Sequence, residues 1–262
     1  MSAIPQQDVI QQILKDNASI RHNSEILNAS KKYQIIDTVD VLNRLINENF
    51  EPIKWTKTNK KFNSHQIVLK HKSLKKVNNN DELNPTVYLT NSNNKVKSFS
   101  LNLGFYRLAC SNGLTVFDSL SHLNRKHIGE NTLQIVDDFL NNFNTSIDEK
   151  IEIIRKFDSI QMSEDDMISF AMEALFYKFG KNNKKVIQDA NSIVKQILVR
   201  NRTLDRENTL WRVYNTVQEN LFNGNFNVNG RKNRGISSSW TQEYVNKKLW
   251  LLADDYSEKL LA

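Results

Sequence analysis

The alternation of apolar and polar residues is clearest in residues 98–116, SFSLNLGFYRLACSNGLTV. In the first half of this segment every second residue is apolar: Phe99, Leu101, Leu103 and Phe105. A period of two is typical of a half-buried strand, with these side chains on its buried face. The dipeptide Asn112-Gly113 then predicts a turn, because both residue types tolerate a positive φ.

Two more strands are predicted upstream of this segment. Residues 66–72, QIVLKHK, alternate in the same way, and residues 86–90, TVYLT, are rich in β-branched and aromatic residues. Residues 75–84 between them are polar and predict a loop, and the run NSNN at 91–94 predicts a turn. Residues 53–117 therefore predict three or four antiparallel strands joined by hairpin-type loops.

Helical spacing of apolar residues is found on both sides of this region. Residues 5–18 and 37–49 predict two helices, with Thr38 as the N-cap of the second and Pro52 beyond its end. Downstream, helices are predicted over residues 131–143, 148–157, 167–179, 186–200, 206–222 and 240–261. Ser163 opens a run that resembles a capping box before the third of these, and Gly180 ends that helix.

The order of these elements predicts an α+β fold, in which a small antiparallel β-sheet is preceded by two helices and followed by a helical C-terminal half. We expect N-terminal helices in residues 1–52, an antiparallel sheet core in 53–125 and a helical region in 126–262, all within one integrated domain. With 262 residues the chain is long enough to bury a full core.

Composition bears on the compartment. Cys110 is the chain's only cysteine, which fits a reducing environment. The sequence has no run of 18 apolar residues, and its first residues lack the basic and apolar regions of a secretory signal. We therefore expect a cytoplasmic protein that does not associate with membranes.

The positive charge is concentrated in the predicted strand region. The chain has a net charge of +7, but residues 53–117 alone contain eleven Lys/Arg and only two acids, Asp81 and Glu82. A localised basic face is the electrostatic signature of a polyanionic partner. Solvated lysines in a chain rich in Asn and Lys explain the same charge equally well.

Basic and aromatic residues are interleaved between Lys54 and Lys72, and proteins that hold single-stranded nucleic acid combine cationic and aromatic side chains in this way. Arg231, Lys232 and Arg234 form a second basic patch in residues 224–239, which we expect to be a flexible loop. The candidate nucleic-acid-binding residues are Lys54, Trp55, Lys57, Lys60, Lys61, Phe62, His65, Lys70, Lys72, Arg107, Arg231, Lys232 and Arg234. The opposing interpretation is that the two aromatic residues belong to the core and the lysines protect a sheet edge.

No catalytic motif stands out. The five histidines form no metal-binding pattern. Neither of the glycine-rich phosphate-binding motifs G-x-x-x-x-G-K-[ST] and G-x-G-x-x-G occurs. Cys110 lacks a cationic neighbour that would stabilise a thiolate, since Arg107 falls on the opposite face of a strand. We therefore predict no catalytic residue, no metal and no cofactor. For Arg107, which lies in an apolar segment, a salt bridge to an acid such as Glu219 is the favoured structural role.

Several blocks resemble a known family. The closest is residues 105–114, FYRLACSNGL, which contains the signature R-x-x-C-x-N-G-L. Further matches lie at residues 30–52, 61–70, 91–92, 208–224 (N-x-L-W and Q-E-N-L) and 246–253. Together they resemble the phage/plasmid-like proteins catalogued as domain of unknown function 932, over residues 30–256. One departure is Asn93-Asn94-Lys95, where that family has a His-Asp-Gly type of turn. The resemblance implies an association with phages and plasmids rather than an activity.

Three functions remain open. The first is non-enzymatic binding and annealing of single-stranded DNA (or RNA) in replication or recombination, by a homo-oligomer; the strand–strand–strand–helix order resembles annealing proteins at the level of fold. The second is a phage counter-defence protein that inhibits a bacterial immune system by contacting a host protein. The third is an enzyme whose site surrounds Arg107, Cys110 and Asn112.

Overall fold

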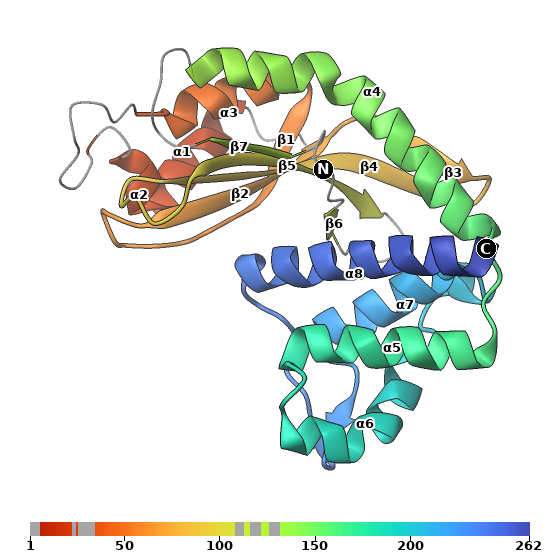
Figure 1. Cartoon of the computed structure of the whole chain (residues 1–262). Helices are drawn as coiled ribbons and strands as arrows, with labels where there is room; N and C mark the ends of the chain where they lie inside the picture. Colours follow the sequence, from red (N-terminus) through yellow and green to blue (C-terminus); the bar gives the residue numbers. More distant parts are fainter. Residues whose placement is uncertain (1–5, 23–24, 26–34, 108–112, 116–121, 126–131) are drawn as a thin grey trace. The chain divides into compact units, whose positions relative to one another are not determined.

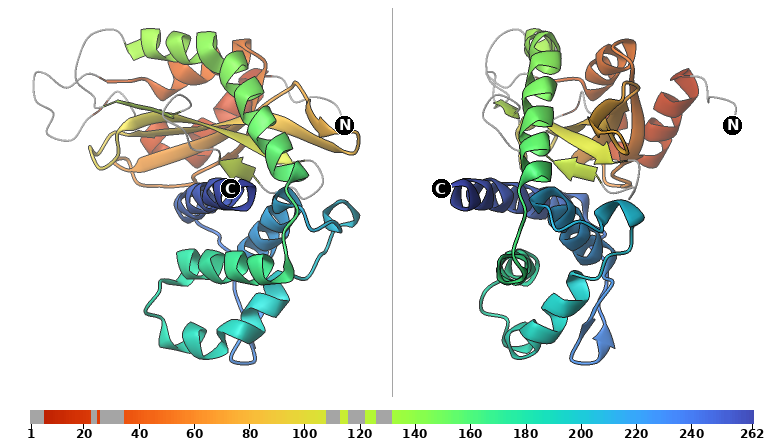
Figure 2. Two further views of the ribbon diagram at one scale, coloured as in Figure 1. Left: turned by 45° about the vertical axis from the view of Figure 1, so that its right-hand side comes forward. Right: turned by 90° about the vertical axis from the view of Figure 1, so that its right-hand side faces the viewer.

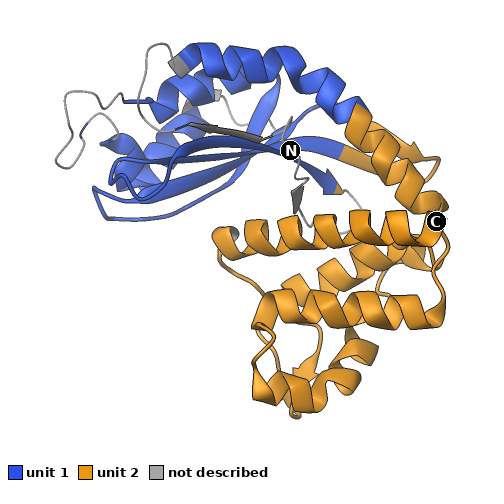
Figure 3. Cartoon of the chain, in the orientation of Figure 1, with its two compact units in different colours: residues 1–74, 84–106, 117–148 blue, residues 75–83, 107–116, 149–262 orange. Residues whose placement is uncertain are grey.

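The computed structural model describes residues 6–22, 25, 35–107, 113–115, 122–125 and 132–262. The chain forms two compact units, each built from several segments (Figure 3). Unit 1 comprises residues 1–74, 84–106 and 117–148, and unit 2 comprises residues 75–83, 107–116 and 149–262.

Unit 1 is built around a β-sheet (Figure 1). Its strands are β1 (Phe50–Trp55), β2 (Ser64–His71), β4 (Asp81–Ser92), β5 (Phe99–Arg107) and β7 (His122–Arg125). The path runs β1-β2-β4-β5, and β7 also pairs with β5. The β1–β2, β2–β4 and β5–β7 pairs are antiparallel, which confirms the predicted kind of sheet.

The predicted burial of β5 was only half right. Phe99, Leu101, Leu103 and Phe105 are buried as expected, but Ser100 and Asn102 on the alternate face are buried as well. Because the residues at these positions are small or polar, other parts of the protein can pack closely against that face of the strand. The alternation therefore reports side-chain size and chemistry here, not exposure to solvent.

Unit 1 has helices α1 (Gln6–Asp16), α2 (Ala18–Arg21) and α3 (Thr38–Asn47), and the first part of α4 (Thr132–Ser159). The N-cap of α3 is Asp37, not Thr38 as predicted, because the Asp37 carboxylate accepts a 2.7 Å hydrogen bond from the Val39 N–H. An aspartate is an equally good cap, and the hydroxyl of Thr38 is instead used inside the unit.

Unit 2 starts with a hairpin where a loop was predicted. β3 (Lys75–Asn78) pairs antiparallel with the start of β4, with Lys75 opposite Leu83 and Lys76 opposite Glu82. The side chain of Asn78 accepts a 3.0 Å hydrogen bond from the Asn80 N–H and closes the turn. Polar composition is therefore misleading here, since a short hairpin needs few apolar residues.

The rest of unit 2 is mainly helical (Figure 2). Its elements are β6 (Gly113–Thr115), the end of α4, α5 (Glu164–Phe179), α6 (Lys184–Ile197), the 3₁₀ turn η1 (Thr203–Asp205), α7 (Leu210–Asn223), β8 (Asn227–Val228), β9 (Arg231–Lys232) and α8 (Ser239–Leu261). Helix α4 is continuous, so the prediction of separate helices at 131–143 and 148–157 was wrong. The residues between those ranges, NTSI, include no glycine or proline that would end a helix.

Helix α5 begins as predicted. The Ser163 hydroxyl oxygen accepts a 3.1 Å hydrogen bond from the Asp166 N–H, and Gly180 ends the helix with a φ of 80°. Helix α7 contacts α5, α6 and α8, and its residues 210–222 are all buried, the polar ones included. The fold class is therefore the predicted α+β class, with a larger sheet than the three or four strands expected. No helix in the described part of the chain is long and apolar enough to cross a membrane.

Candidate functional site

The most basic part of unit 1 is the loop between β1 and β2, residues 56–63, here called the lysine loop. Its Lys57, Lys60 and Lys61 are exposed. The backbone is held from the side of the N-terminal helices, where Thr58 N–H donates to the Asp16 carbonyl at 3.0 Å and Ala18 N–H donates to the Thr58 carbonyl at 2.8 Å. The lysine loop is therefore ordered before any ligand binds.

A second anchor comes from the turn after β4. The Asn93 side-chain amide donates to the carbonyls of Lys61, Ser19 and His22, and its oxygen accepts from the Asn63 N–H at 2.9 Å. Asn93 is the first residue of the triplet that departs from the His-Asp-Gly type of turn. In this chain it ties the lysine loop to the N-terminal helices and to the sheet.

The two candidate aromatic residues lie at opposite ends of this loop, and both are half-buried. The Trp55 indole N–H donates a 3.0 Å hydrogen bond to the Asp16 carboxylate, which fixes its ring. Lys61 Nζ lies 5.5 Å from the centroid of the Phe62 ring. Neither residue is a core residue, and each leaves part of its ring accessible.

Several of the lysines are partly neutralised by acids. Lys57 Nζ lies 3.1 Å from the Asp16 carboxylate, and this contact and the Trp55 N–H lower the pKa of Asp16. Lys61 pairs with Glu25, whose pKa is lowered by that contact and by His22. Lys72 lies 3.6 Å from Glu51. The net positive charge of this surface is therefore smaller than the lysine count implies.

The remaining cations of the segment lie on or beside the sheet. Lys54 is exposed on β1, although partial burial lowers its pKa. Lys70 is half-buried on β2, directly opposite Glu51 in the β1–β2 register. Lys60 is exposed at the tip of the loop.

His65 lies inside unit 1 and not on its surface. Its Nδ1 lies 2.9 Å from the Ser19 hydroxyl and its Nε2 lies 2.9 Å from the Thr38 hydroxyl. The Asn91 amide donates to the Thr38 hydroxyl oxygen at 2.9 Å, and the Ser19 hydroxyl donates to the Asn17 side-chain oxygen at 2.8 Å. All five side chains are buried.

The directions of these bonds assign the protons. Because the Ser19 proton is used toward Asn17, Ser19 accepts from His65 Nδ1–H. The second hydrogen bond of the ring joins Nε2 to the Thr38 hydroxyl. This buried chain ties α2 and α3 to β2 and β4, and it offers no accessible nucleophile.

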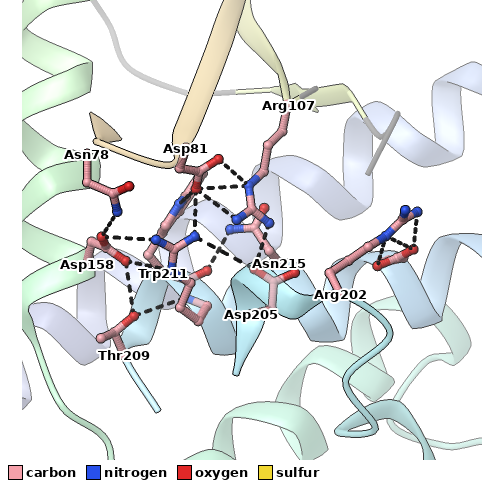
Figure 4. A network of polar contacts seen from close by, with 11 residues as sticks. Asn78, Asp81, Arg107, Asp158, Arg202, Asp205, Thr209, Trp211 and Asn215 are labelled. Carbon is pink, nitrogen blue, oxygen red and sulfur yellow. Dashed lines mark hydrogen bonds and ion pairs between the residues drawn. The ribbon is translucent and has the colours of Figure 1, made fainter. Parts of the chain in front are cut away.

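Arg107 is also buried, in unit 2, where it pairs with two carboxylates (Figure 4). Its Nε and Nη2 donate to Asp81 at 2.8 Å each, and its Nη1 donates to Asp205 Oδ1 at 2.7 Å. Glu219, the predicted partner, instead pairs with Arg202 at 2.8 Å. The predicted role of Arg107 in a salt bridge is therefore confirmed, while the suggested partner was wrong.

A second arginine extends this cluster. Arg212 Nη1 donates to Asp81 Oδ2 at 2.8 Å, and its Nε lies 3.0 Å from Asp158 Oδ1. The Trp211 indole N–H also donates to Asp81 Oδ2, at 2.9 Å. The Asp81 carboxylate thus accepts hydrogen bonds from arginine and indole groups of β5 and α7. Asp158, which lies on α4, connects that helix to the cluster through Arg212.

The chemistry of this cluster favours a structural role. Each carboxylate accepts hydrogen bonds from an arginine, so none is left as a free base. Burial raises the pKa of Asp205, against the opposing effect of Arg107. Among the described residues, no group of three or more His, Cys, Asp or Glu side chains could hold a metal ion. Cys110 and Asn112 of the third hypothesis lie outside the described residues.

The second basic patch is exposed. Arg231, Lys232 and Arg234 all reach solvent in unit 2. They lie in and beside the β8–β9 hairpin, so the prediction of a loop without secondary structure for residues 224–239 was wrong. Of the thirteen candidate residues, the structure therefore buries His65 and Arg107, keeps eight in or near the lysine loop and β1–β2, and places three on the hairpin of unit 2.

Fold and side-chain clusters together define an α+β protein with a helix-flanked antiparallel sheet and a buried Arg–Asp cluster. The chain belongs to the family described as a domain of unknown function (DUF932), whose model matches residues 27–250. It is similar to the UPF0380 proteins YafZ and YfjQ of Escherichia coli strain K12. Each is 25% identical over 244 residues, which cover 86% of this chain and 82% of the relative. No solved structure matches the chain.

Two of the blocks that carry the family resemblance meet at this cluster. Arg107 comes from the R-x-x-C-x-N-G-L block and Trp211 from the N-x-L-W block, and both donate to Asp81. In the Q-E-N-L block, Gln218 donates to Asn246 at 2.7 Å, and Asn220 donates to the carbonyls of residues 197 and 199. These blocks therefore hold unit 2 together from α7. Sequence reasoning missed Asp81, which stood out only as one of two acids in a basic region.

Proposed function

We propose that this protein binds single-stranded nucleic acid without enzymatic activity, and that it acts in the cytoplasm in phage- or plasmid-type replication or recombination, annealing strands as a homo-oligomer. The observation that supports this proposal is the lysine loop, a pre-ordered segment with Trp55 at one end and Phe62 at the other. Part-exposed aromatic rings beside lysines are the elements from which single-strand grooves are made.

The order of the loop matters for affinity. A loop that is already fixed loses little conformational entropy when a strand binds. The anchors at Thr58, Asn93 and Asn63 supply that order through hydrogen bonds within the protein. Bases can stack on rings whose orientation is set, while Lys57, Lys60 and Lys61 neutralise phosphates. His65 and Arg107 are left out of the proposed surface because both are buried.

The experiment is a titration of a fluorescein-labelled dT30 oligonucleotide, followed by anisotropy at 25 to 300 mM salt. We expect binding that weakens steeply with salt. The double variant Lys60→Gln/Phe62→Ala should weaken binding by roughly tenfold, since stacking on one base contributes about 1–3 kcal/mol. The matched control is Lys15→Gln/Phe139→Ala, an exposed lysine of α1 and a half-buried phenylalanine of α4. Absence of binding by the wild-type protein at 25 mM salt would overturn the proposal.

A second candidate is the counter-defence function, in which the same face contacts a bacterial host protein. It is favoured by the pairing of Lys57, Lys61 and Lys72 with acids, which suits a mixed-charge protein interface better than a polyphosphate. Ile53 on the edge strand β1 adds an apolar side chain that is 39% exposed. Light scattering separates the two, because annealing predicts an assembly that grows with dT30 and an inhibitor predicts a particle unchanged by it.

A further inference from the structure

A second basic surface lies in unit 2, on α6 and the β8–β9 hairpin. Residues 180–200 and 224–238 contain eight Lys/Arg and a single acid, Asp189. The remaining 226 residues contain 28 Lys/Arg and 28 Asp/Glu, so these two segments carry the equivalent of the chain's whole net charge. We call this the α6–hairpin surface.

Hydrogen bonds attach the hairpin along α6. Asn227 N–H donates to the Gln196 side-chain oxygen at 2.9 Å, near the end of the helix. Asn229 N–H donates to the Asp189 carboxylate at 2.7 Å, and the Asn229 amide donates to the Lys185 carbonyl at 3.4 Å. The turn of the hairpin therefore lies against the first half of α6, and the one acid of the surface is occupied by a backbone donor.

The hairpin itself is well ordered. Asn229 and Gly230 have φ values of 49° and 73°, which suit a two-residue hairpin turn. At its base, Ile236 N–H donates to the Phe222 carbonyl at 2.7 Å, and Lys178 Nζ donates to the Arg234 carbonyl at 3.2 Å. The arginines and lysine on the hairpin are thus presented from a fixed backbone, in contrast to the flexible loop expected from the sequence.

The cations of this surface differ from those of the lysine loop in their partners. All eight are exposed, and within the described part of the chain none forms an ion pair with an acid: Lys181, Lys184, Lys185, Lys195, Arg200, Arg231, Lys232 and Arg234. In the lysine loop, Lys57 and Lys61 are both paired. An uncompensated surface attracts a polyanion more strongly than a compensated one with the same lysine count.

We propose that the α6–hairpin surface is the main phosphate-backbone contact of a bound single-stranded nucleic acid. The inference rests on the proposed function and adds to it a phosphate-binding surface in unit 2. The surface has no exposed aromatic residue, since Phe226 is buried, so it can neutralise phosphates but cannot stack bases. It differs in this from the lysine loop of unit 1, where the rings of Trp55 and Phe62 are half-buried.

The test uses the variant Lys184→Gln/Lys185→Gln/Arg231→Gln/Lys232→Gln in the full chain. Each phosphate contact on a single strand contributes about −0.7 to the slope of log K against log salt. The loss of four contacts should therefore make the slope less negative by about 2.8. At 100 mM salt we expect the Kd for dT30 to rise by roughly tenfold or more. Glutamine keeps the helix propensity of lysine and removes only the charge.

The matched control is Lys76→Gln/Lys156→Gln/Arg206→Gln/Lys259→Gln, which removes four exposed cations of unit 2 that lie outside the surface. Its slope should stay close to that of the wild-type protein. Circular dichroism and thermal melting of both variants confirm that each is folded. If the two variants have the same slope and the same Kd, the α6–hairpin surface is not the main contact.

A base-free oligonucleotide of the same length separates the two roles. The α6–hairpin variant should lose binding to the base-free strand, whereas Lys60→Gln/Phe62→Ala should bind it almost as the wild-type protein does. The reverse pattern would place the phosphate contact on the lysine loop and leave the proposed function standing. If the wild-type protein binds neither dT30 nor an RNA strand of the same length, U30, at low salt, the proposed function itself is wrong.

Discussion

Arg107 and Trp211 donate hydrogen bonds to the same oxygen of Asp81, although they lie far apart in the sequence. Arg107 Nη2 is 2.8 Å from Oδ2 and Trp211 Nε1 is 2.9 Å from it. Asp81 and Arg107 are each 1% exposed. Two of the sequence blocks that carry the family resemblance are thus joined through one buried carboxylate in unit 2.

Removing the charge of Asp81 should destabilise the protein strongly. In Asp81→Asn, Arg107 and Arg212 lose a shared carboxylate, and breaking a buried ion pair costs about 3–5 kcal/mol. Equilibrium unfolding in urea measures the loss. Lys259→Gln is the control, because its exposed pair with Asp166 at 3.4 Å contributes less than about 1 kcal/mol. Equal unfolding free energies for the two variants would show that the Arg–Asp cluster does not hold unit 2 together.

The buried hydrogen-bonded chain around His65 predicts different losses of stability for two substitutions of Thr38. Thr38→Val keeps the shape but removes the hydroxyl, so His65 Nε2 and an Asn91 N–H lose their partner, at a cost of about 1–3 kcal/mol. Thr38→Ser keeps the hydroxyl and removes one buried methyl, at a cost of about 1 kcal/mol. Urea unfolding should therefore rank wild type, Ser and Val in falling stability. A serine variant less stable than the valine variant would mean that packing, not the hydrogen bonds, decides this site.

The fold could be predicted where one rule acts alone. Helix α5 has a capping serine, an apolar run and a terminal glycine, so its bounds follow from local sequence. The hairpin of β3 and β4 was missed because its pairing partners, such as Lys76 and Glu82, are polar, and pairing rather than burial makes the strands. Helix α7 was predicted from the spacing of its apolar residues, but the burial of its polar face was not, since that depends on neighbours distant in sequence.

The candidate surface was predictable in its residues but not in its charge. Lys57 and Lys61 stand out in the sequence as basic residues interleaved with aromatic ones. Their acidic partners, Asp16 and Glu25, belong to the N-terminal region, and no local pattern links them. For the same reason Arg107 was assigned to Glu219 instead of Asp81 and Asp205. Long-range pairing of charges is set by the fold, so a local charge count overestimates the field of such a surface.

The turn after β4 offers a gain of stability. Lys95 has a φ of 62°, in the left-handed region that favours glycine, and it replaces the glycine of the His-Asp-Gly type of turn. Relief of that conformation is worth about 1–2 kcal/mol, and the extra chain entropy of glycine offsets about 0.5–1 kcal/mol. Lys95→Gly should raise the melting temperature by a few degrees. The control Lys97→Gly, where φ is not positive, should lower it. A lower melting temperature in both would show that the Lys95 side chain contributes more than its backbone costs.

Lys178 predicts a pH dependence of stability. Burial lowers its pKa to about 8 from the usual value of 10.5, although its Nζ donates to the Leu221 carbonyl at 2.6 Å and lies 4.9 Å from the Phe226 ring centroid. Between pH 8 and 10.5 the unfolded chain therefore binds more protons than the folded one at this site, so its contribution to stability rises with pH. Below pH 8 the cost of keeping the ammonium buried is constant.

Urea unfolding at pH 7.5, 8.5 and 9.5 measures the effect in the wild-type protein and in Lys178→Met. The unfolding free energy of the wild-type protein, relative to that of Lys178→Met, should rise with pH, because only the wild type titrates at this position. Parallel profiles across that range would mean that Lys178 keeps an ordinary pKa and is solvated in the folded protein.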